Sequence, residues 1–320
     1  MNTYRYRLQP YDGMASRFTC PACGTAHRFV RYIDTLTGHF LNEKVGRCER
    51  TESCGYHYTP RQYFDDLRRL GITPPPVSAV PSPPEDNPVT FSTIPSGLLT
   101  GSALASQPEQ TALLRFLTGR LHLSADQLRR LIDTYRLQSA TYGRIVFPQI
   151  DANGNCRTAK IMAYNPATGH RIKDRAGSFN WLHRILISQG KLPRDFRLRQ
   201  CLFGEHLLPA HPLKPVGIVE SEKTALICSL TYPKLLWLAT GGKYNFTPDR
   251  FLPLSGRIIN AIPDAGSYRF WTLKAKAVTR LVRCQLHVSD CIERAATLDE
   301  HQRGIDIADL ILDNRPPQFF

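Results

Sequence analysis

The chain lacks the features that mark several common classes of protein. No apolar run approaches the roughly 18 residues of a membrane helix, and the opening stretch MNTYRYRLQP has no signal-peptide core. Neither an internal repeat nor a nucleotide-hydrolysing P-loop is recognisable in the 320 residues. We therefore expect a cytoplasmic protein with no membrane partner.

Acidic residues are scarce beside basic ones. Asp and Glu number 27 against 41 Lys and Arg, which gives a formal net charge of +14 and a pI near 9.5. This balance favours a polyanionic partner, and nucleic acid is the leading candidate, although a basic surface alone would give the same totals. The hydrophobic fraction of 42% can fill the cores of two or three domains.

The nine cysteines are an odd number, and in a reducing compartment they are not expected to form a disulfide framework. Four of them form two close pairs: Cys20 with Cys23, and Cys48 with Cys54. Two such pairs can direct four thiolates at one tetrahedral ion, which predicts a structural zinc site; four buried, metal-free cysteines are the alternative. Because the second pair is widely spaced, His57 and His27 are reserve donors.

The chain divides into four segments that differ in composition and in hydrophobic pattern. Residues 1–66 carry the cysteine module and a short helix, and the Pro/Ser-rich stretch within 67–104 predicts an extended linker. Residues 105–200 read as two amphipathic helices followed by strands joined by turns. In residues 201–316, short apolar runs alternate with helical or Gly-rich segments, which is typical of a parallel sheet with helical crossovers.

Acidic residues follow two of these apolar runs. Glu220 closes VGIVE and Asp264 closes RIINAIPD, while Asp306 and Asp309 lie at helical spacing in GIDIADL. In an open parallel sheet ligands gather at the carboxyl ends of the strands, and Mg²⁺ is commonly held by one or two carboxylates there. Each acid taken alone has a simpler explanation: strand-end acids often belong to turns, and Asp306 may only cap a helix.

These motifs together resemble a known family. VGIVESEKTAL, ATGG, AIPDAG and GIDIADL occur in the order found in the Toprim domain of bacterial-type primases, topoisomerases and related nucleases. GRIVFPQIDANGNCRTAKIMAY resembles the strand-rich segment that precedes Toprim in bacterial-type (DnaG-like) primases, and the cysteine module resembles their zinc ribbon. The resemblance implies an α/β multidomain chain: a zinc ribbon, an α+β primase-like segment and a Rossmann-like Toprim domain with a mainly parallel sheet.

The resemblance also implies roles for the acids. Glu220 matches the invariant glutamate of the family, and Asp264 matches the first aspartate of its Asp-x-Asp motif. The second aspartate is missing because position 266 is Gly, and the usual Glu-Gly is Glu220-Ser221 here. Asp306 and Asp309 resemble the late acidic element of primases, so the four carboxylates are the expected catalytic residues, with Mg²⁺ or Mn²⁺ bound at Glu220 and Asp264.

Basic residues of the middle segment fit the same resemblance as binders of template or triphosphate. The candidates are Arg157, Lys160, Arg171, Lys173 and Arg175, followed by Lys243 after a Gly-Gly pair. Lys223 lies one turn after Glu220, and we expect it to be solvated on its helix.

Three functions follow as hypotheses. The first is a DNA primase of a mobile genetic element that joins nucleotides on single-stranded DNA with Mg²⁺ or Mn²⁺. The second, prompted by Gly266, is a catalytically degenerate DNA-binding protein that assists replication or mobilisation. The third is a Toprim nuclease. Since the chain has no recognisable P-loop, a replicative helicase partner would be a separate protein, as would mobilisation proteins.

Overall fold

The chain forms two compact units, Met1–Val89 and Thr90–Phe320. The computed structural model describes residues 5–11, 13–35, 37–51, 53–70, 91–99, 104, 107–173 and 177–317. Most of the expected linker at 67–104, together with Arg175, lies outside the described residues. The expected division between residues 105–200 and 201–316 stays a prediction, because both fall in the second unit. No described helix is long and apolar enough to cross a membrane.

The first unit is a small antiparallel sheet followed by one helix. Its strands pair in sequence order: β1 (Tyr6–Leu8), β2 (Phe29–Asp34), β3 (Gly46–Cys48) and β4 (His57–Tyr58). Thr59 caps the helix α1 (Pro60–Arg69) through a capping box with Gln62. Cys20, Phe29 and Cys48 form the buried cluster of this unit, which is a core too small to be expected to hold the sheet without further support.

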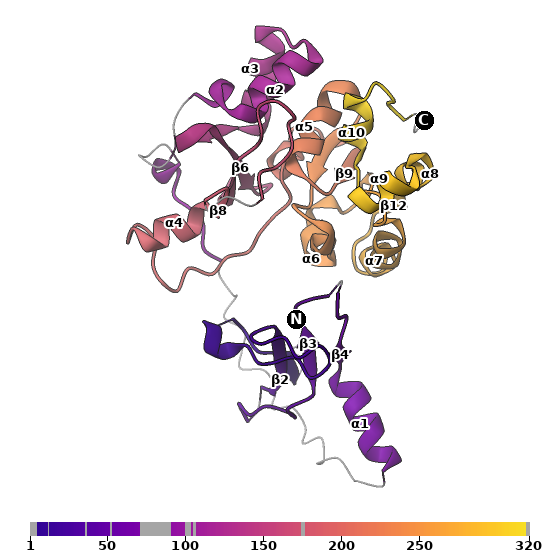
Figure 1. Cartoon of the computed structure of the whole chain (residues 1–320). Helices are drawn as coiled ribbons and strands as arrows, with labels where there is room; N and C mark the ends of the chain where they lie inside the picture. The colour runs from indigo at the N-terminus through magenta and orange to yellow at the C-terminus, as the bar shows by residue number, and fades with distance from the viewer. Residues whose placement is uncertain are drawn as a thin grey trace. The chain divides into compact units, whose positions relative to one another are not determined.

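The second unit begins with two helices and an antiparallel sheet (Figure 1). Ser124 and Gln127 form the capping box that the sequence predicts at the start of the second helix. The helices are α2 (Ala112–Leu121) and α3 (Ala125–Tyr135), and the strands, again in sequence order, are β5 (Gln138–Ala140), β6 (Arg144–Ile150), β7 (Cys156–Met162) and β8 (Phe179–Trp181). Helix α4 (Leu182–Ser188) covers one face of this sheet, with Leu182 and Leu186 in its core.

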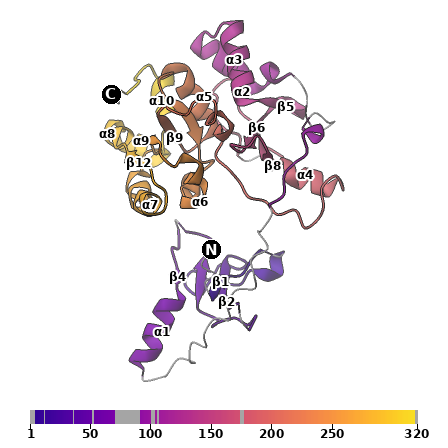
Figure 2. The same cartoon turned by 180° about the vertical axis from the view of Figure 1, so that it is seen from behind.

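The rest of the second unit is built on a parallel sheet, as the sequence predicts. The strands lie in the order β10 (Leu236–Ala239), β9 (Val216–Val219), β11 (Ile258–Ala261) and β12 (Gln285–Val288). Helices in this part are α5 (Glu222–Thr231), α6 (Pro248–Phe251), α7 (Tyr268–Leu281), α8 (Cys291–Ala295), α9 (Leu298–Arg303) and α10 (Ile307–Leu312). The same elements are seen from behind in Figure 2.

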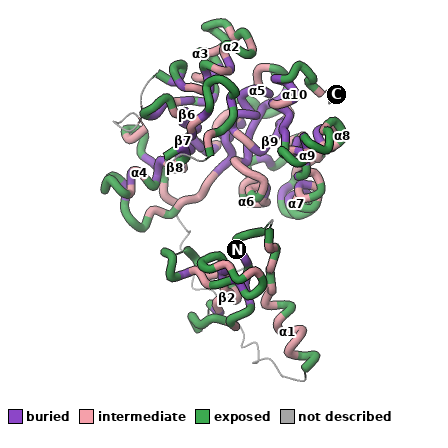
Figure 3. Tube along the Cα trace, in the orientation of Figure 1, coloured by how far each residue is buried: buried purple, intermediate pink, exposed green. Residues whose placement is uncertain are grey.

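Alternating residues of the parallel strands pack against different helices. On one face Val219, Trp237 and Ala239 share a core with α5 and α10, and on the other Ile218 and Leu238 pack with the aromatic residues of α6 and α7. The two strands β9 and β10 are therefore buried on both faces, as the purple trace around β9 shows (Figure 3).

The strand order creates a topological switch point beside β9. The chain passes from β9 through α5 to β10 on one side, and then crosses to β11 on the other side. Glu220 directly follows β9, and Asp264 follows β11 after Ile262 and Pro263. The carboxyl ends of adjacent parallel strands that part in this way form the usual ligand crevice of an open α/β sheet.

Candidate functional site

The four cysteines of the first unit converge on one point. Cys20 and Cys54 have their sulfur atoms 3.7 Å apart, and the sulfur atoms of Cys23 and Cys48 are 4.0 Å apart. All four lie within 4.8 Å of one another. Four thiolates at zinc distance of about 2.3 Å in a tetrahedron would lie about 3.8 Å apart, so this donor set fits a structural zinc ion.

Local backbone turns bring the cysteines together. The N–H of Gly24 donates to the carbonyl of Cys20 at 2.9 Å, and both Gly24 and Gly55 have a positive φ, at 67° and 65°. Each of these glycines follows a cysteine ligand, so the left-handed turn comes where a side chain would be strained. Hydrogen bonds from Thr25 lower the pKa of the Cys23 thiol to about 6, whereas burial raises that of Cys48 to about 12.

The reserve histidine donors are not part of this cluster. His57 instead shares a 3.0 Å hydrogen bond with the Tyr32 hydroxyl, and its ring stacks on the Tyr32 ring with an interplanar angle of 5°. Neither His57 nor His27 joins the four cysteines among the described residues. The four cysteines predicted as zinc ligands therefore form the cluster without either reserve donor.

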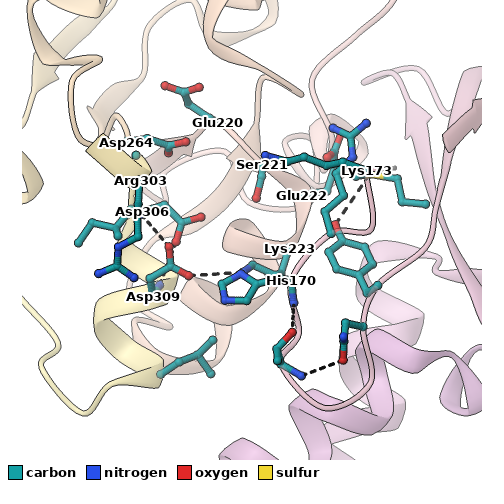
Figure 4. A pocket seen from close by; sticks show the side chains of 18 of the residues that line it. His170, Lys173, Glu220, Ser221, Glu222, Lys223, Asp264, Arg303, Asp306 and Asp309 are labelled. Carbon is teal, nitrogen blue, oxygen red and sulfur yellow. Dashed lines mark hydrogen bonds and ion pairs between the residues drawn. The ribbon is translucent and has the colours of Figure 1, made fainter. Parts of the chain in front are cut away.

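A cavity of about 1270 Å³ opens at the carboxyl ends of β9 and β11. All four acids predicted from the sequence line it: Glu220, Asp264, Asp306 and Asp309. Figure 4 shows these side chains along one side of the cavity and Lys173 on the other. In the described chain, however, no three carboxylates here approach as closely as the cysteine sulfur atoms do. We refer to this cavity as the acidic pocket.

Glu220 differs from the other three acids because one of its buried carboxylate oxygens lacks a hydrogen-bond partner among the described residues. The residue is only 7% exposed, and its Oε1 atom is buried with no hydrogen-bond partner in the described structure. Burial raises the pKa of the carboxyl group; the Ser267 hydroxyl and the Lys243 ammonium act in the opposite direction, while Asp306 adds to the rise. A buried carboxylate oxygen without a donor is costly unless a cation occupies the space before it.

Asp264 lies on a short loop that is fixed at several points. Ala265 donates its N–H to the carbonyl of Ile305 at 2.9 Å, and Gly266 donates its N–H to Glu293 Oε2 at 2.9 Å. Burial raises the pKa of Asp264 well above its usual range, and the carboxylates of Asp306, Glu220 and Asp309 raise it further. The loop thus holds a carboxylate close to like charges, an arrangement that a bound cation would relieve.

Asp306 and Asp309 both act in the capping box of α10. The N–H of Asp309 donates to Asp306 Oδ1 at 2.9 Å, and the N–H of Asp306 donates to Asp309 Oδ2 at 3.1 Å. The Thr224 hydroxyl donates to Asp306 Oδ2, and Lys223 Nζ lies 3.6 Å from Asp309 Oδ1. Helix capping, the simpler explanation for Asp306, is therefore part of what this pair does.

Some of the predicted basic residues lie at the acidic pocket. Arg171 and Lys173 line it, beside His170. Lys243 donates to the carbonyl of Gly266 at 3.3 Å, so it lies beside the loop that carries Asp264. These side chains are near the place where an anionic substrate would meet the acids.

Lys160 lines the acidic pocket but is already paired. Its ammonium lies 2.8 Å from Glu222 Oε1 and donates to the carbonyl of Gly241 at 3.1 Å, and both Lys160 and Glu222 are buried. A buried lysine in a buried ion pair stabilises the pocket wall rather than remaining available to a phosphate.

Arg157 does not line the acidic pocket. It pairs with Asp151 at 2.7 Å beside a separate cavity of about 180 Å³. Arg157 and Lys160 are three residues apart on β7, and residues at odd spacing on a strand point to opposite faces of the sheet. Arg157 and Lys160 therefore do not line the acidic pocket together, and a role for Arg157 in binding nucleic acid stays a prediction.

The expectation that Lys223 is solvated was also wrong. The sequence predicts a solvated lysine on the helix surface, but Lys223 is 8% exposed and lines the acidic pocket. Helix α5 is buried from Glu222 to Cys228 because it lies between β10 and α10. The sequence could have indicated the position of Lys223 at the pocket, because the first turn of a helix that follows a sheet strand lies at the ligand-binding edge of the sheet.

Two family models match parts of the chain, and one of them describes a zinc ribbon. Residues 4–69 match the family model described as "Zinc beta-ribbon finger, putative", and residues 111–265 match the "Domain of unknown function (DUF6371)". No curated protein matches the chain. The predicted zinc ribbon is confirmed by the first match together with the four converging cysteines.

Solved structures of DnaG-type primases are similar to the chain. The RNA polymerase domain of Mycobacterium tuberculosis primase DnaG is 13% identical with a TM-score of 0.40, over 66% of this chain and 75% of that one. The primase fragment of the bacteriophage T7 primase-helicase is 16% identical with a TM-score of 0.36, over 90% and 96%. The Aquifex aeolicus primase is 15% identical with a TM-score of 0.37, over 60% and 47%. Because these TM-scores are all below 0.5, a function for this chain has to be argued from its own residues.

Proposed function

We propose that the chain is a primase-like protein of a mobile element that joins nucleotides on single-stranded DNA with a divalent cation in the acidic pocket. The observation that carries the proposal is the unpartnered, buried Oε1 of Glu220 at the switch point between β9 and β11. Asp264 approaches the same place from the neighbouring strand, and both residues offer the oxygen donors that Mg²⁺ and Mn²⁺ accept.

Each group of residues then has a chemical task. Glu220 and Asp264 hold the cation, which would favour the ionised primer hydroxyl and offset the charge of the triphosphate. Arg171 and Lys173, which also line the pocket, bind phosphate groups of template or nucleotide. Lys160 and Glu222 fix the wall beside Gly241, and Asp306 and Asp309 complete the acidic side of the pocket.

Primer synthesis by the zinc-loaded full chain tests the proposal. The protein is incubated with single-stranded templates, labelled nucleotides and Mg²⁺ or Mn²⁺. We expect template-dependent products and a loss of at least about a hundredfold in rate for Glu220→Gln, since the change removes a charge that the transition state needs. Glu109→Gln, the same change at an exposed glutamate, is the matched control. No product from any template, or equal rates for wild type and Glu220→Gln, would refute it.

A second candidate function is DNA binding without synthesis. It is favoured by Gly266, which has no carboxylate and gives its N–H to Glu293 where the resemblance expects a second aspartate. This candidate predicts DNA binding that weakens steeply with salt and responds little to Asp264→Asn. If the synthesis assay shows template cleavage instead of extension, the pocket belongs to a nuclease.

A further inference from the structure

Lys223 is a buried ammonium inside the acidic pocket. It is the second residue of α5, and with 8% exposure it is far more buried than lysine usually is. Its side chain reaches Asp309 Oδ1 at 3.6 Å (Figure 4). A buried lysine is stable only beside compensating negative charge, and the acidic pocket supplies it.

The late acidic pair is already occupied by the protein itself. Each of the four carboxylate oxygens of Asp306 and Asp309 has a partner: the two backbone N–H groups of the capping box, the Thr224 hydroxyl and the Lys223 ammonium. Glu220 differs, because its Oε1 is buried without a partner in the described structure. The side of the acidic pocket at Glu220 is therefore open to a cation, whereas the side at Asp306 and Asp309 already contains the Lys223 ammonium.

Two other cationic side chains that line the pocket, those of Lys160 and Arg303, have other partners. Lys160 is paired with Glu222, and Arg303 is paired with Asp299 at 2.9 Å on the exposed side of α9. Gly266 also removes one carboxylate that a second divalent cation would use. Fewer acids and a resident ammonium both reduce the room for a second ion.

We propose that Lys223 occupies one cation position of the acidic pocket, so that the chain binds a single divalent cation, at Glu220 and Asp264. The inference rests on the proposed function and specifies the cation content of the same site. Lys223 is a positioning residue here: its fixed charge holds Asp309 and the start of α10 in place, which a divalent cation would otherwise do.

Counting bound Mn²⁺ on the zinc-loaded full chain tests the inference without an activity assay. Titrations followed by electron paramagnetic resonance and by calorimetry compare the wild type with Lys223→Met, Lys223→Arg and Glu220→Gln. We expect one Mn²⁺ on the wild type and on Lys223→Arg. We expect Lys223→Met to bind a second Mn²⁺, or to bind the first at least about tenfold more tightly, because a nearby positive charge has gone. Thermal melting verifies that each variant is folded.

The outcomes separate the inference from the proposed function. If Glu220→Gln abolishes Mn²⁺ binding but Lys223→Met changes neither the number of ions nor their affinity, the inference fails alone. Two Mn²⁺ ions on the wild type with an unchanged count on Lys223→Met also overturn it. If the wild type binds no Mn²⁺, or if Glu220→Gln has no effect on binding, both the inference and the cation site of the proposed function fail.

Discussion

The cysteine cluster and the acidic pocket, for which we propose a zinc ion and a divalent cation respectively, are built in opposite ways. The cysteine site uses one ligand type from two short stretches of chain, and its four sulfur atoms converge within 4.8 Å. The acidic pocket collects its carboxylates from the ends of β9 and β11 and from the start of α10. Four thiolates would close the cysteine site around a zinc ion, whereas the acidic pocket stays open over about 1270 Å³.

The difference follows from what each site has to do. A structural zinc ion replaces a missing hydrophobic core, so its ligands need only the local turns at Gly24 and Gly55. A site that accepts substrate must leave room beside the cation, so its ligands are placed by a large scaffold and stay apart. Glu220 and Asp264 accordingly depend on the register of two parallel strands.

Cys48→Ser has the largest expected effect. Structural zinc contributes roughly 10–16 kcal/mol of apparent binding free energy in small zinc modules, so loss of one thiolate should release the ion and unfold the first unit. Zinc content and limited proteolysis of the full chain measure this, with cleavage expected within Met1–Val89 and not within Thr90–Phe320.

His57→Ala is the control for the cysteine site. His57 lies beside the cluster but bonds Tyr32, so this variant should retain its zinc. We expect the cysteine site to fold independently of the acidic pocket. Weaker Mn²⁺ binding in the acidic pocket of Cys48→Ser would contradict this expectation.

Lys160→Met has the next largest effect and tests whether the pocket wall is structural. The substitution leaves the buried Glu222 carboxylate unpaired, and breaking a buried ion pair in this way costs about 3–5 kcal/mol. Urea unfolding measures the loss. The double variant Lys160→Met with Glu222→Leu should recover much of the stability, because no buried charge remains. If Lys160→Met is as stable as wild type and loses only nucleotide binding, Lys160 is a phosphate ligand instead.

Much of the cysteine site and of the sheet scaffold could be predicted from the sequence. The cysteine spacing predicted the ligands because both turns are local. The apolar runs predicted β9 and β10 because strands buried on both faces are continuously hydrophobic, and a shorter apolar run predicted β11, although Ile258 is exposed. Glu220 and Asp264 followed from the ends of those runs. β12 was not predicted, because its exposed and half-buried residues give no such run.

The remaining features of the pocket depend on tertiary packing. A lysine at the start of a polar-looking helical turn reads as solvated, and only the contact of α5 with α10 buries Lys223. The pairing of Lys160 with Glu222 joins residues 62 positions apart, one on strand β7 and the other on helix α5, which no local pattern encodes. Likewise, the hydrogen bond from Gly266 to Glu293 becomes visible only when α8 is in place.

The pH dependence of stability has the smallest expected effect and concerns the acidic pocket alone. The pKa values of Glu220, Asp264 and Asp309 are raised by burial, so the cation-free folded chain holds these protons more tightly than the unfolded chain. The free energy of unfolding should therefore fall as the pH rises from the unfolded pKa near 4 to the raised folded values. The fall is about 1.4 kcal/mol for a pKa raised by one.

Comparing wild type with Glu220→Gln isolates this contribution from other groups. Glu205, whose pKa burial raises to about 7, acts with the same sign in both proteins and cancels in the difference. As the pH rises from the unfolded pKa near 4 through the raised folded pKa of Glu220, the wild type should lose more stability than Glu220→Gln, and Mg²⁺ should restore the wild type only. Glu109→Gln should follow the wild type, because that glutamate is exposed. If the free energies of unfolding of wild type and Glu220→Gln change equally with pH, repulsion between the carboxylates does not raise the pKa of Glu220 in the folded chain. The acidic pocket would then differ from the cysteine site only in the type of its ligands.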